Sequence, residues 1–159
     1  MGDPMEGVMK RFTLPALLAA FVGAGVTQVV FAQSAPTVAV VKDPGCGCCT
    51  KWVAHLKQAG YKATVTESAA IDSLKDSKGV PRAARSCHTA TVGSYVIEGH
   101  VPAADITRLL KERPDIVGLA VPGMPVGSPG MEAPDGHAAS FDVIAFDKAG
   151  KTRVFASHR

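Results

Sequence analysis

The sequence contains no run of Lys and Arg interleaved with aromatic residues, and no amphipathic segment with a basic polar face. Proteins that bind nucleic acids carry the first pattern, and proteins that lie on membrane surfaces carry the second. The 17 Lys and Arg residues only slightly exceed the 14 Asp and Glu residues and are scattered along the chain. We therefore expect neither nucleic acid nor a membrane surface as a partner of the folded domain.

Other patterns that would define a function are also missing. The sequence has no internal repeat, no cysteine spacing typical of an iron–sulfur cluster, and no second Cys-x-x-Cys pair of the kind that binds a single zinc ion. Ser86, Thr89, Asp72 and Glu98 offer no credible arrangement for hydrolysis, so acyl-transfer chemistry is excluded. These absences leave the cysteines as the main candidates for chemistry.

The long hydrophobic run lies near the N-terminus, where residues 14–30 are almost wholly apolar. A Lys-Arg pair precedes the run, and Val30 and Ala32 are small residues at the positions that a signal peptidase reads. A transmembrane anchor is the weaker alternative, because the run is at the short limit for a membrane span. We predict an export signal over residues 1–32 and one mature domain over residues 33–159.

The hydrophobic pattern of the mature chain predicts an α/β domain. Short apolar or alternating runs indicate strands, and apolar residues at helical spacing indicate helices. The expected strands are residues 37–42, 61–67 and 89–98, the last being either a hairpin that turns at Gly93 or one longer strand. The expected helices are residues 49–59, 69–78 and 102–113, with a short helical turn over residues 81–85.

Two further segments complete the predicted fold. Residues 118–137 contain four prolines, several glycines and the two methionines of the mature chain, which predicts a functional or disordered loop without regular structure. Residues 141–146 and 152–156 predict a terminal β-hairpin. The alternation of strands and helices, with cysteines opening the first helix, predicts a thioredoxin-like sheet with flanking helices, plus the Gly/Pro/Met loop and the C-terminal hairpin.

Three of the four cysteines, Cys46, Cys48 and Cys49, lie within four positions between the first expected strand and the first expected helix. A helix N-terminus favours the thiolate form, so this position indicates reactive or metal-binding sulfurs. In a thioredoxin-like fold the loop before the third strand faces the same turn, and here that loop contains Cys87. We therefore expect all four sulfurs to converge.

Three interpretations of these sulfurs are compatible with the sequence. Adjacent cysteines form a poor cage for one tetrahedral ion but suit several soft ions, such as Cu(I), that share thiolates. Alternatively, Cys46 and Cys49 form a redox disulfide, with the helix terminus and nearby Lys51 or Arg85 lowering a thiol pKa, and Cys48 and Cys87 form a second couple. Permanent structural disulfides are the third interpretation, disfavoured because clustered cysteines close only very short loops.

Three other side chains are candidates for the same site. His88 directly follows Cys87, so it is either a ligand, a hydrogen-bond donor to one, or an ordinary polar residue. Met124 and Met131 offer thioethers to Cu(I), or alternatively pack the loop against the domain.

The remaining histidines of the mature chain are not expected to take part. His100 follows a turn glycine and is expected to be only a turn residue. His55 is expected on the exposed face of the first helix, and His137 and His158 in mobile segments.

Four blocks of sequence together resemble the CopG-type copper-resistance proteins of the periplasm, a metal-binding family of unknown function. The blocks are KDPGCGCC (42–49), SCHTA (86–90), EGHVPA (98–103) and AVPGMPVGSPGME (120–132). The resemblance implies a thioredoxin-like fold, periplasmic location and a role in copper resistance. It also implies a centre of several Cu(I) ions bridged by cysteines, and a change of copper oxidation state.

On this resemblance, the thiolate ligands are Cys46, Cys48, Cys49 and Cys87, because each occupies a matching motif position. The expected partners are copper ions and other copper-handling proteins of the periplasm. The alternative function is a thiol–disulfide oxidoreductase that acts on protein partners.

Overall fold

The computed structural model describes residues 35–159, so the export signal predicted for residues 1–32 lies outside the described residues. Among the helices of this described part, none is long and apolar enough to cross a membrane. The elements in chain order are β1 (Thr37–Lys42), α1 (Gly47–Gln58), β2 (Lys62–Glu67), α2 (Ile71–Ser77), the short 3₁₀ helix η1 (Arg82–Ala84), β3 (His88–Val92), β4 (Tyr95–Glu98), α3 (Ala103–Glu112), β5 (Gly118–Ala120), β6 (Phe141–Phe146) and β7 (Thr152–His158).

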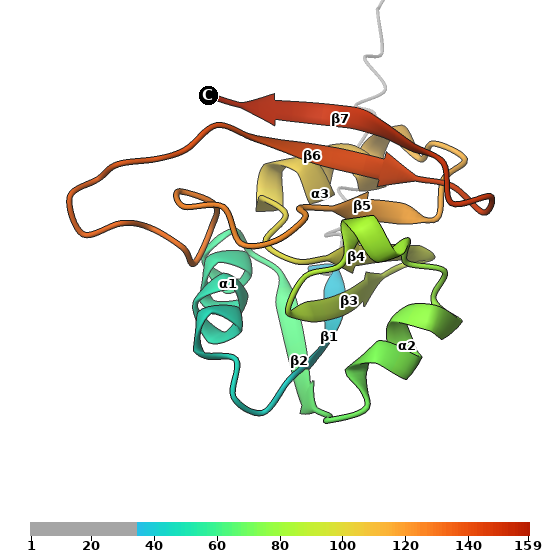
Figure 1. The fold of residues 1–159 in the computed structure, drawn as a ribbon, viewed down its shortest axis with the longest axis horizontal. Helices are drawn as coiled ribbons and strands as arrows, with labels where there is room; N and C mark the ends of the chain where they lie inside the picture. The colour runs from blue at the N-terminus through green and yellow to red at the C-terminus, as the bar shows by residue number, and fades with distance from the viewer. Residues whose placement is uncertain (1–34) are drawn as a thin grey trace, which may run out of the picture. The chain divides into compact units, whose positions relative to one another are not determined.

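The strands form one seven-stranded sheet in the order β2-β1-β3-β4-β5-β6-β7 (Figure 1). β1 pairs with β2 in parallel and with β3 in antiparallel orientation, and β4 is antiparallel to β3. This β2-β1-β3-β4 order, with α1 between the two parallel strands, is the predicted thioredoxin-like arrangement, which the structure confirms. β5 then pairs with β4 in parallel, and the antiparallel hairpin of β6 and β7 extends the sheet.

Two hydrophobic clusters lie on opposite faces of the sheet, because successive side chains of a strand alternate between its faces. The larger cluster joins α1 and α3 to the sheet and includes Trp52, Leu56 and Ile106. The smaller cluster contains Val80 and Ala84 of the segment after α2. The sheet therefore separates α1 and α3 from the α2–η1 segment. The first turn of α1 follows β1 after a short loop.

Most predicted elements are confirmed, and the hairpin alternative holds for residues 89–98, since β3 and β4 pair across Gly93 and Ser94. The prediction that residues 118–137 lack regular structure is wrong at its start, where β5 forms. This three-residue strand is stabilised by pairing with β4 and β6, and such long-range pairing leaves no local pattern in the sequence. Val65 is 44% exposed on β2, which is an edge strand of the described sheet.

Candidate metal centre

The first turn of α1 carries three cysteines. The helix starts two residues earlier than predicted, so Cys46 is its N-cap residue and Cys48 and Cys49 lie within its first turn. Cys46 and Cys49 form a disulfide with their Cα atoms 5.5 Å apart. Cys48 is a free thiol that is partly exposed, whereas Cys49 is completely buried. This side of the site therefore contains a Cys-x-x-Cys disulfide and one accessible thiol.

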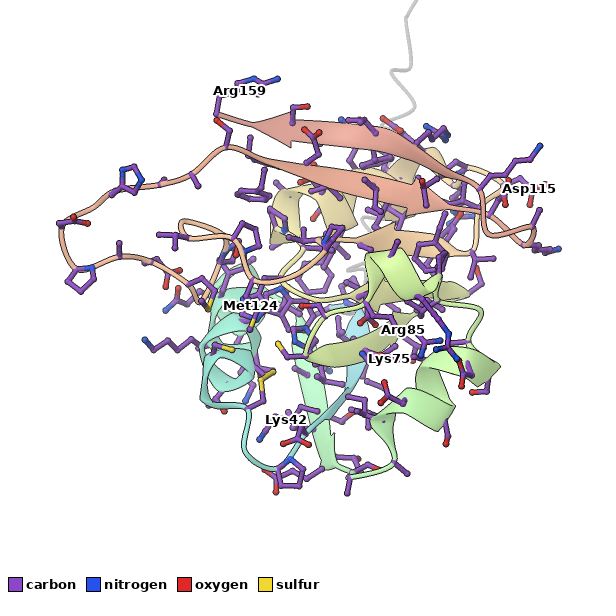
Figure 2. All side chains as sticks on the ribbon, in the orientation of Figure 1. Lys42, Lys75, Arg85, Asp115, Met124 and Arg159 are labelled. Carbon is purple, nitrogen blue, oxygen red and sulfur yellow. A yellow bond between two sulfur atoms is a disulfide. The ribbon has the colours of Figure 1, made fainter. Side chains whose placement is uncertain are left out.

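Cys87, directly before β3, brings the fourth sulfur to this turn. Its Sγ lies 3.4 Å from the Sγ of Cys49 and 3.9 Å from that of Cys48, and the sulfurs of Cys46 and Cys48 are 3.6 Å apart. All four sulfurs lie within 4.8 Å of one another. The sulfur atoms gather between α1 and β3 (Figure 2), as the thioredoxin-like topology predicts.

His100 also belongs to this cluster, which the sequence-based expectation of a simple turn residue missed. Its side chain is completely buried, and its Nε2 lies 3.5 Å from the Sγ of Cys87. Its Nδ1 lies 2.8 Å from the carbonyl oxygen of Pro129, which can only accept a hydrogen bond. Nδ1 therefore carries the proton, and in the neutral ring the Nε2 lone pair faces the sulfur.

The register of the β3–β4 hairpin explains how His100 reaches Cys87. Thr89 pairs with Glu98, so two residues further along the antiparallel strands Cys87 and His100 lie opposite each other. Choosing the hairpin alternative from the sequence would have identified this pair. The signal was therefore present in the spacing of the two residues around Gly93.

His88 is completely buried beside the sulfurs. Its ring packs 4.3 Å from the ring of Trp52 and 5.3 Å from that of His100, and its Nδ1 lies 3.9 Å from the Sγ of Cys87. Its Nε2 has no hydrogen-bond partner among residues 35–159. Burial, followed by repulsion from His100 and Lys75, lowers the pKa of His88 to about 3. The ring is therefore a neutral nitrogen donor at physiological pH.

The Cys87 thiol is held in its protonated form in the metal-free protein. Burial, and next the charge of Cys48, raise the pKa of Cys87 to about 11. The Arg85 guanidinium, one of the cations expected near the sulfurs, faces Asp72 and Asp76. Burial also lowers the pKa of His100. The interior of the site thus disfavours charge of either sign unless a cation compensates the thiolates.

The loop between β5 and β6 places one of its two methionines at the cysteines. Met124 is half exposed, and its Sδ lies 3.7 Å from the Sγ of Cys48. Met131 instead lines a cavity of about 610 Å³ together with Cys48 and Lys51. At Gly130 the loop touches α1 so closely that a Cβ would lie 2.8 Å from the backbone nitrogen of Trp52, so only glycine fits. The loop thus has a defined path over the first turn of α1.

The other histidines have structural contacts that the sequence did not indicate. His55 is half-buried rather than exposed, and its Nε2 accepts a hydrogen bond from the backbone N–H of Ala103 at the start of α3, with an N···N distance of 3.1 Å. His158 is the last residue of β7, and its Nε2 lies 2.7 Å from the carboxylate of Asp105. His137 is exposed in the loop between β5 and β6, whereas the expectation of a mobile segment is wrong for His158, which belongs to a paired strand.

The donor set suits a soft monovalent metal. Thiolate and thioether sulfurs select Cu(I), and neutral imidazole is also a ligand for copper. A second overlapping group, Cys49, Cys87, His88 and His100, also has its donor atoms within 4.8 Å of one another. The imidazoles of His88 and His100 are therefore buried nitrogen donors beside the Cys87 sulfur, although the sequence pattern identified only His88.

Comparison with known proteins gives a consistent result. A family model described as a protein of unknown function, DUF411, matches residues 84–131. The chain is similar to a solved structure of copper resistance protein CopG, form 2, with a TM-score of 0.74 and 43% identity, covering 79% of this chain and 99% of that one. Form 1 of the same protein gives a TM-score of 0.72 and 44% identity, covering 77% and 96%. No curated protein sequence matches significantly.

Proposed function

Because the chain belongs to the CopG family of copper resistance proteins, we propose that it is a periplasmic protein that holds several Cu(I) ions in one cysteine-bridged cluster. The proposed thiolate ligands are Cys46, Cys48, Cys49 and Cys87. The observation that carries the proposal is the position of Cys87, whose sulfur lies within 3.9 Å of two sulfurs from the first turn of α1. The location follows from the predicted export signal and the family.

Charge balance favours several monovalent ions over one divalent ion. Four deprotonated cysteines carry four negative charges, and one divalent ion would neutralise only half of them. Cysteines that bind a single tetrahedral ion are normally two to four residues apart, so the adjacent Cys48 and Cys49 suit thiolates that bridge several ions better than a cage for one ion. Several Cu(I) ions satisfy both the charge and the geometry.

Four further side chains complete the proposed centre. Met124 and Met131 supply thioethers from the loop, with Met124 the nearer to Cys48. His100 presents the lone pair of Nε2, and the Pro129 carbonyl fixes its ring orientation. His88 is the remaining nitrogen donor. Other copper-handling proteins of the periplasm are the proposed sources and recipients of the metal.

The disulfide of Cys46 and Cys49 supports a redox component of the same function. Two reduced cysteines that form this disulfide lose two electrons and two protons, which reduces two Cu(II) ions to two Cu(I) ions. In this oxidised state only Cys48 and Cys87 are free to hold Cu(I) as thiolates, and the proposed four-thiolate cluster belongs to the state in which the disulfide is reduced. This stoichiometry links the oxidation state of the copper to the Cys-x-x-Cys pair.

The same disulfide also favours a second candidate function, a thiol–disulfide oxidoreductase that acts on protein partners. Cys46 caps α1 and is partly exposed, as an attacking thiol in this fold requires. Turnover of a disulfide substrate that survives removal of copper by a chelator, and that is abolished by Cys46→Ser, would support this candidate over copper handling.

The test of the main proposal is a titration of the fully reduced protein with Cu(I) in competition with a chromophoric Cu(I) chelator. We expect more than one Cu(I) per chain and an ultraviolet absorption band from thiolate-to-copper charge transfer. Elemental analysis after gel filtration measures the stoichiometry independently. A single zinc-like ion that Cu(I) does not displace, or no binding, would reject the proposal.

A further inference from the structure

A buried ion pair lies on the opposite side of β3 and β4 from His88 and Trp52, and we propose that it positions Cys87. The pair consists of Lys75 from α2 and Glu98 at the end of β4, whose side chains are 2% and 0% exposed. The Nζ of Lys75 lies 2.6 Å from Oε1 of Glu98. Figure 2 shows Lys75 between α2 and β3, near Arg85. Neither residue touches the sulfurs directly.

The Glu98 carboxylate connects this pair to the backbone of the cysteine segment. Its Oε1 accepts a hydrogen bond from the backbone N–H of Ser86 at 2.6 Å, and its Oε2 accepts one from the hydroxyl of Thr89 at 2.7 Å. Lys75 donates to the same Thr89 hydroxyl at 2.9 Å. Cys87 is therefore held between two residues that both bond to one carboxylate.

Ser86 transmits the same constraint to the loop that carries Met124. Its hydroxyl donates to the carbonyl oxygen of Gly123, the residue directly before Met124. Ser86 also packs against Gly99, where a Cβ would lie 2.7 Å from the Cβ of Ser86, so the side chain has little room to move. Glu98 thus sets the positions of Cys87 and Met124, the two residues that approach Cys48 from outside α1.

Stability alone is a weak reason for this arrangement. Removing two charges from water costs free energy that their attraction often fails to recover, and apolar replacements of similar volume are frequently neutral or stabilising. A carboxylate nevertheless has a property that an apolar side chain lacks here, because it accepts the Ser86 N–H. Lys75 and Thr89 fix the orientation in which Glu98 does so.

This inference rests on the proposed copper site. The distance between Cys48 and Cys87 matters there because the two thiolates would share metal ions. Its test, however, needs no copper. In a Cys46→Ser, Cys49→Ser background, only Cys48 and Cys87 remain, and their disulfide is equilibrated with glutathione in the presence of a metal chelator. The equilibrium constant measures the effective concentration of one thiol at the other.

Two double variants in that background separate the hydrogen bond from the charges. Lys75→Met with Glu98→Gln removes both charges but keeps an oxygen that accepts the Ser86 N–H and an amide that donates to Thr89. Lys75→Met with Glu98→Met removes the charges and the acceptor. We expect the second variant to lower the effective concentration about 10-fold and the first to stay within about 2-fold of the parent background.

Urea unfolding of both variants, with the disulfide reduced, checks that a difference in global stability does not explain the result. Equal effective concentrations in both variants and the parent background would overturn the inference, as would an equal decrease in both variants. If the Glu98→Met variant does not fold, Thr89→Val in the same background replaces it as the test. We expect this change to lower the effective concentration of the two thiols about 3-fold. No change would mean that Glu98 does not position Cys87. Failure of copper binding would leave these thiol measurements unchanged, so the two proposals fail separately.

Discussion

The two halves of the candidate centre differ in origin and in surroundings. One half is a single turn of chain at the start of α1, where Cys46 and Cys48 are partly exposed and Cys46 forms a disulfide with Cys49. The other half comes from the ends of β3 and β4, where His88 and His100 are completely buried. The first half is therefore partly exposed and contains the disulfide, whereas the second half contributes buried, neutral imidazole nitrogens beside Cys87.

Replacing Cys87 with Ser tests whether the two halves act as one centre. Cys87 is the single sulfur that the buried half contributes, so its loss leaves the thiols of α1 without a bridge to the sheet. We expect the Cu(I) affinity of the reduced protein to fall by at least about 1,000-fold, measured by competition with a Cu(I) chelator, together with a lower stoichiometry. Unchanged stoichiometry would show that α1 alone forms the centre.

Acid should lower the free energy of unfolding through the buried half of the centre, because His88 is buried there as a neutral ring. The pKa of His88 is about 3 in the folded protein, against 6.5 as its ordinary value, so the unfolded chain binds a proton more readily. The stability that this neutral ring contributes is present above pH 6.5 and is lost as the pH falls towards 3. For the reduced, metal-free protein we expect a loss of about 3 kcal/mol by pH 4 from this group.

Urea unfolding between pH 7 and pH 4 measures this loss, and histidine ring NMR assigns it. The ring of His88 should stay neutral in the folded protein throughout this range. Protonation of the His88 ring near pH 6 without any loss of stability would contradict the buried, unpaired environment.

Replacing His100 with Asn tests whether this residue of the buried half contributes to Cu(I) binding. The imidazole Nε2 faces Cys87 and the ring is oriented by the carbonyl of Pro129, so its loss should lower Cu(I) affinity about 10-fold. His137→Asn is the matched control, because this histidine is exposed in the loop and should leave the affinity unchanged. Equal effects of the two changes would remove His100 from the centre.

The smallest expected effect concerns the loop, which covers the exposed half. Met124→Leu keeps the side-chain volume but removes the thioether 3.7 Å from Cys48, so we expect Cu(I) to be lost to a chelator about 3-fold faster. Met131→Leu is the comparison, and a smaller change is expected because its sulfur makes no contact with a cysteine among the described residues. A larger effect of Met131→Leu than of Met124→Leu would indicate that Met131, in the cavity beside Cys48, is the thioether ligand instead.

Local patterns predicted much of this molecule. The strand of valines, the amphipathic helix after the cysteines and the proline at the start of α3 each indicate their own structure, because a few neighbouring residues determine it. The cysteine turn could be located for the same reason. The order of these elements was enough to predict the thioredoxin-like sheet and hence that Cys87 would approach Cys48 and Cys49.

Predictions that depended on pairing or burial were less successful. β5 was missed because its three residues are ordered by the neighbouring strands, and His100 was missed because the register of the hairpin was left open. Burial determined the protonation state of Cys87, because it is the main cause that raises the pKa of this thiol to about 11. Desolvation depends on what surrounds a group, and residues distant in sequence provide those surroundings.

By itself, the sequence determined which sulfurs are present, their spacing in one turn and the order of elements that holds them. Only the tertiary structure decided that His88 and His100 lie beside those sulfurs as neutral donors, and that Glu98 holds the backbone before Cys87. The physical reason is that side-chain chemistry and helical or strand periodicity are local properties. Distances across a sheet and the exclusion of water arise only when distant segments pack together.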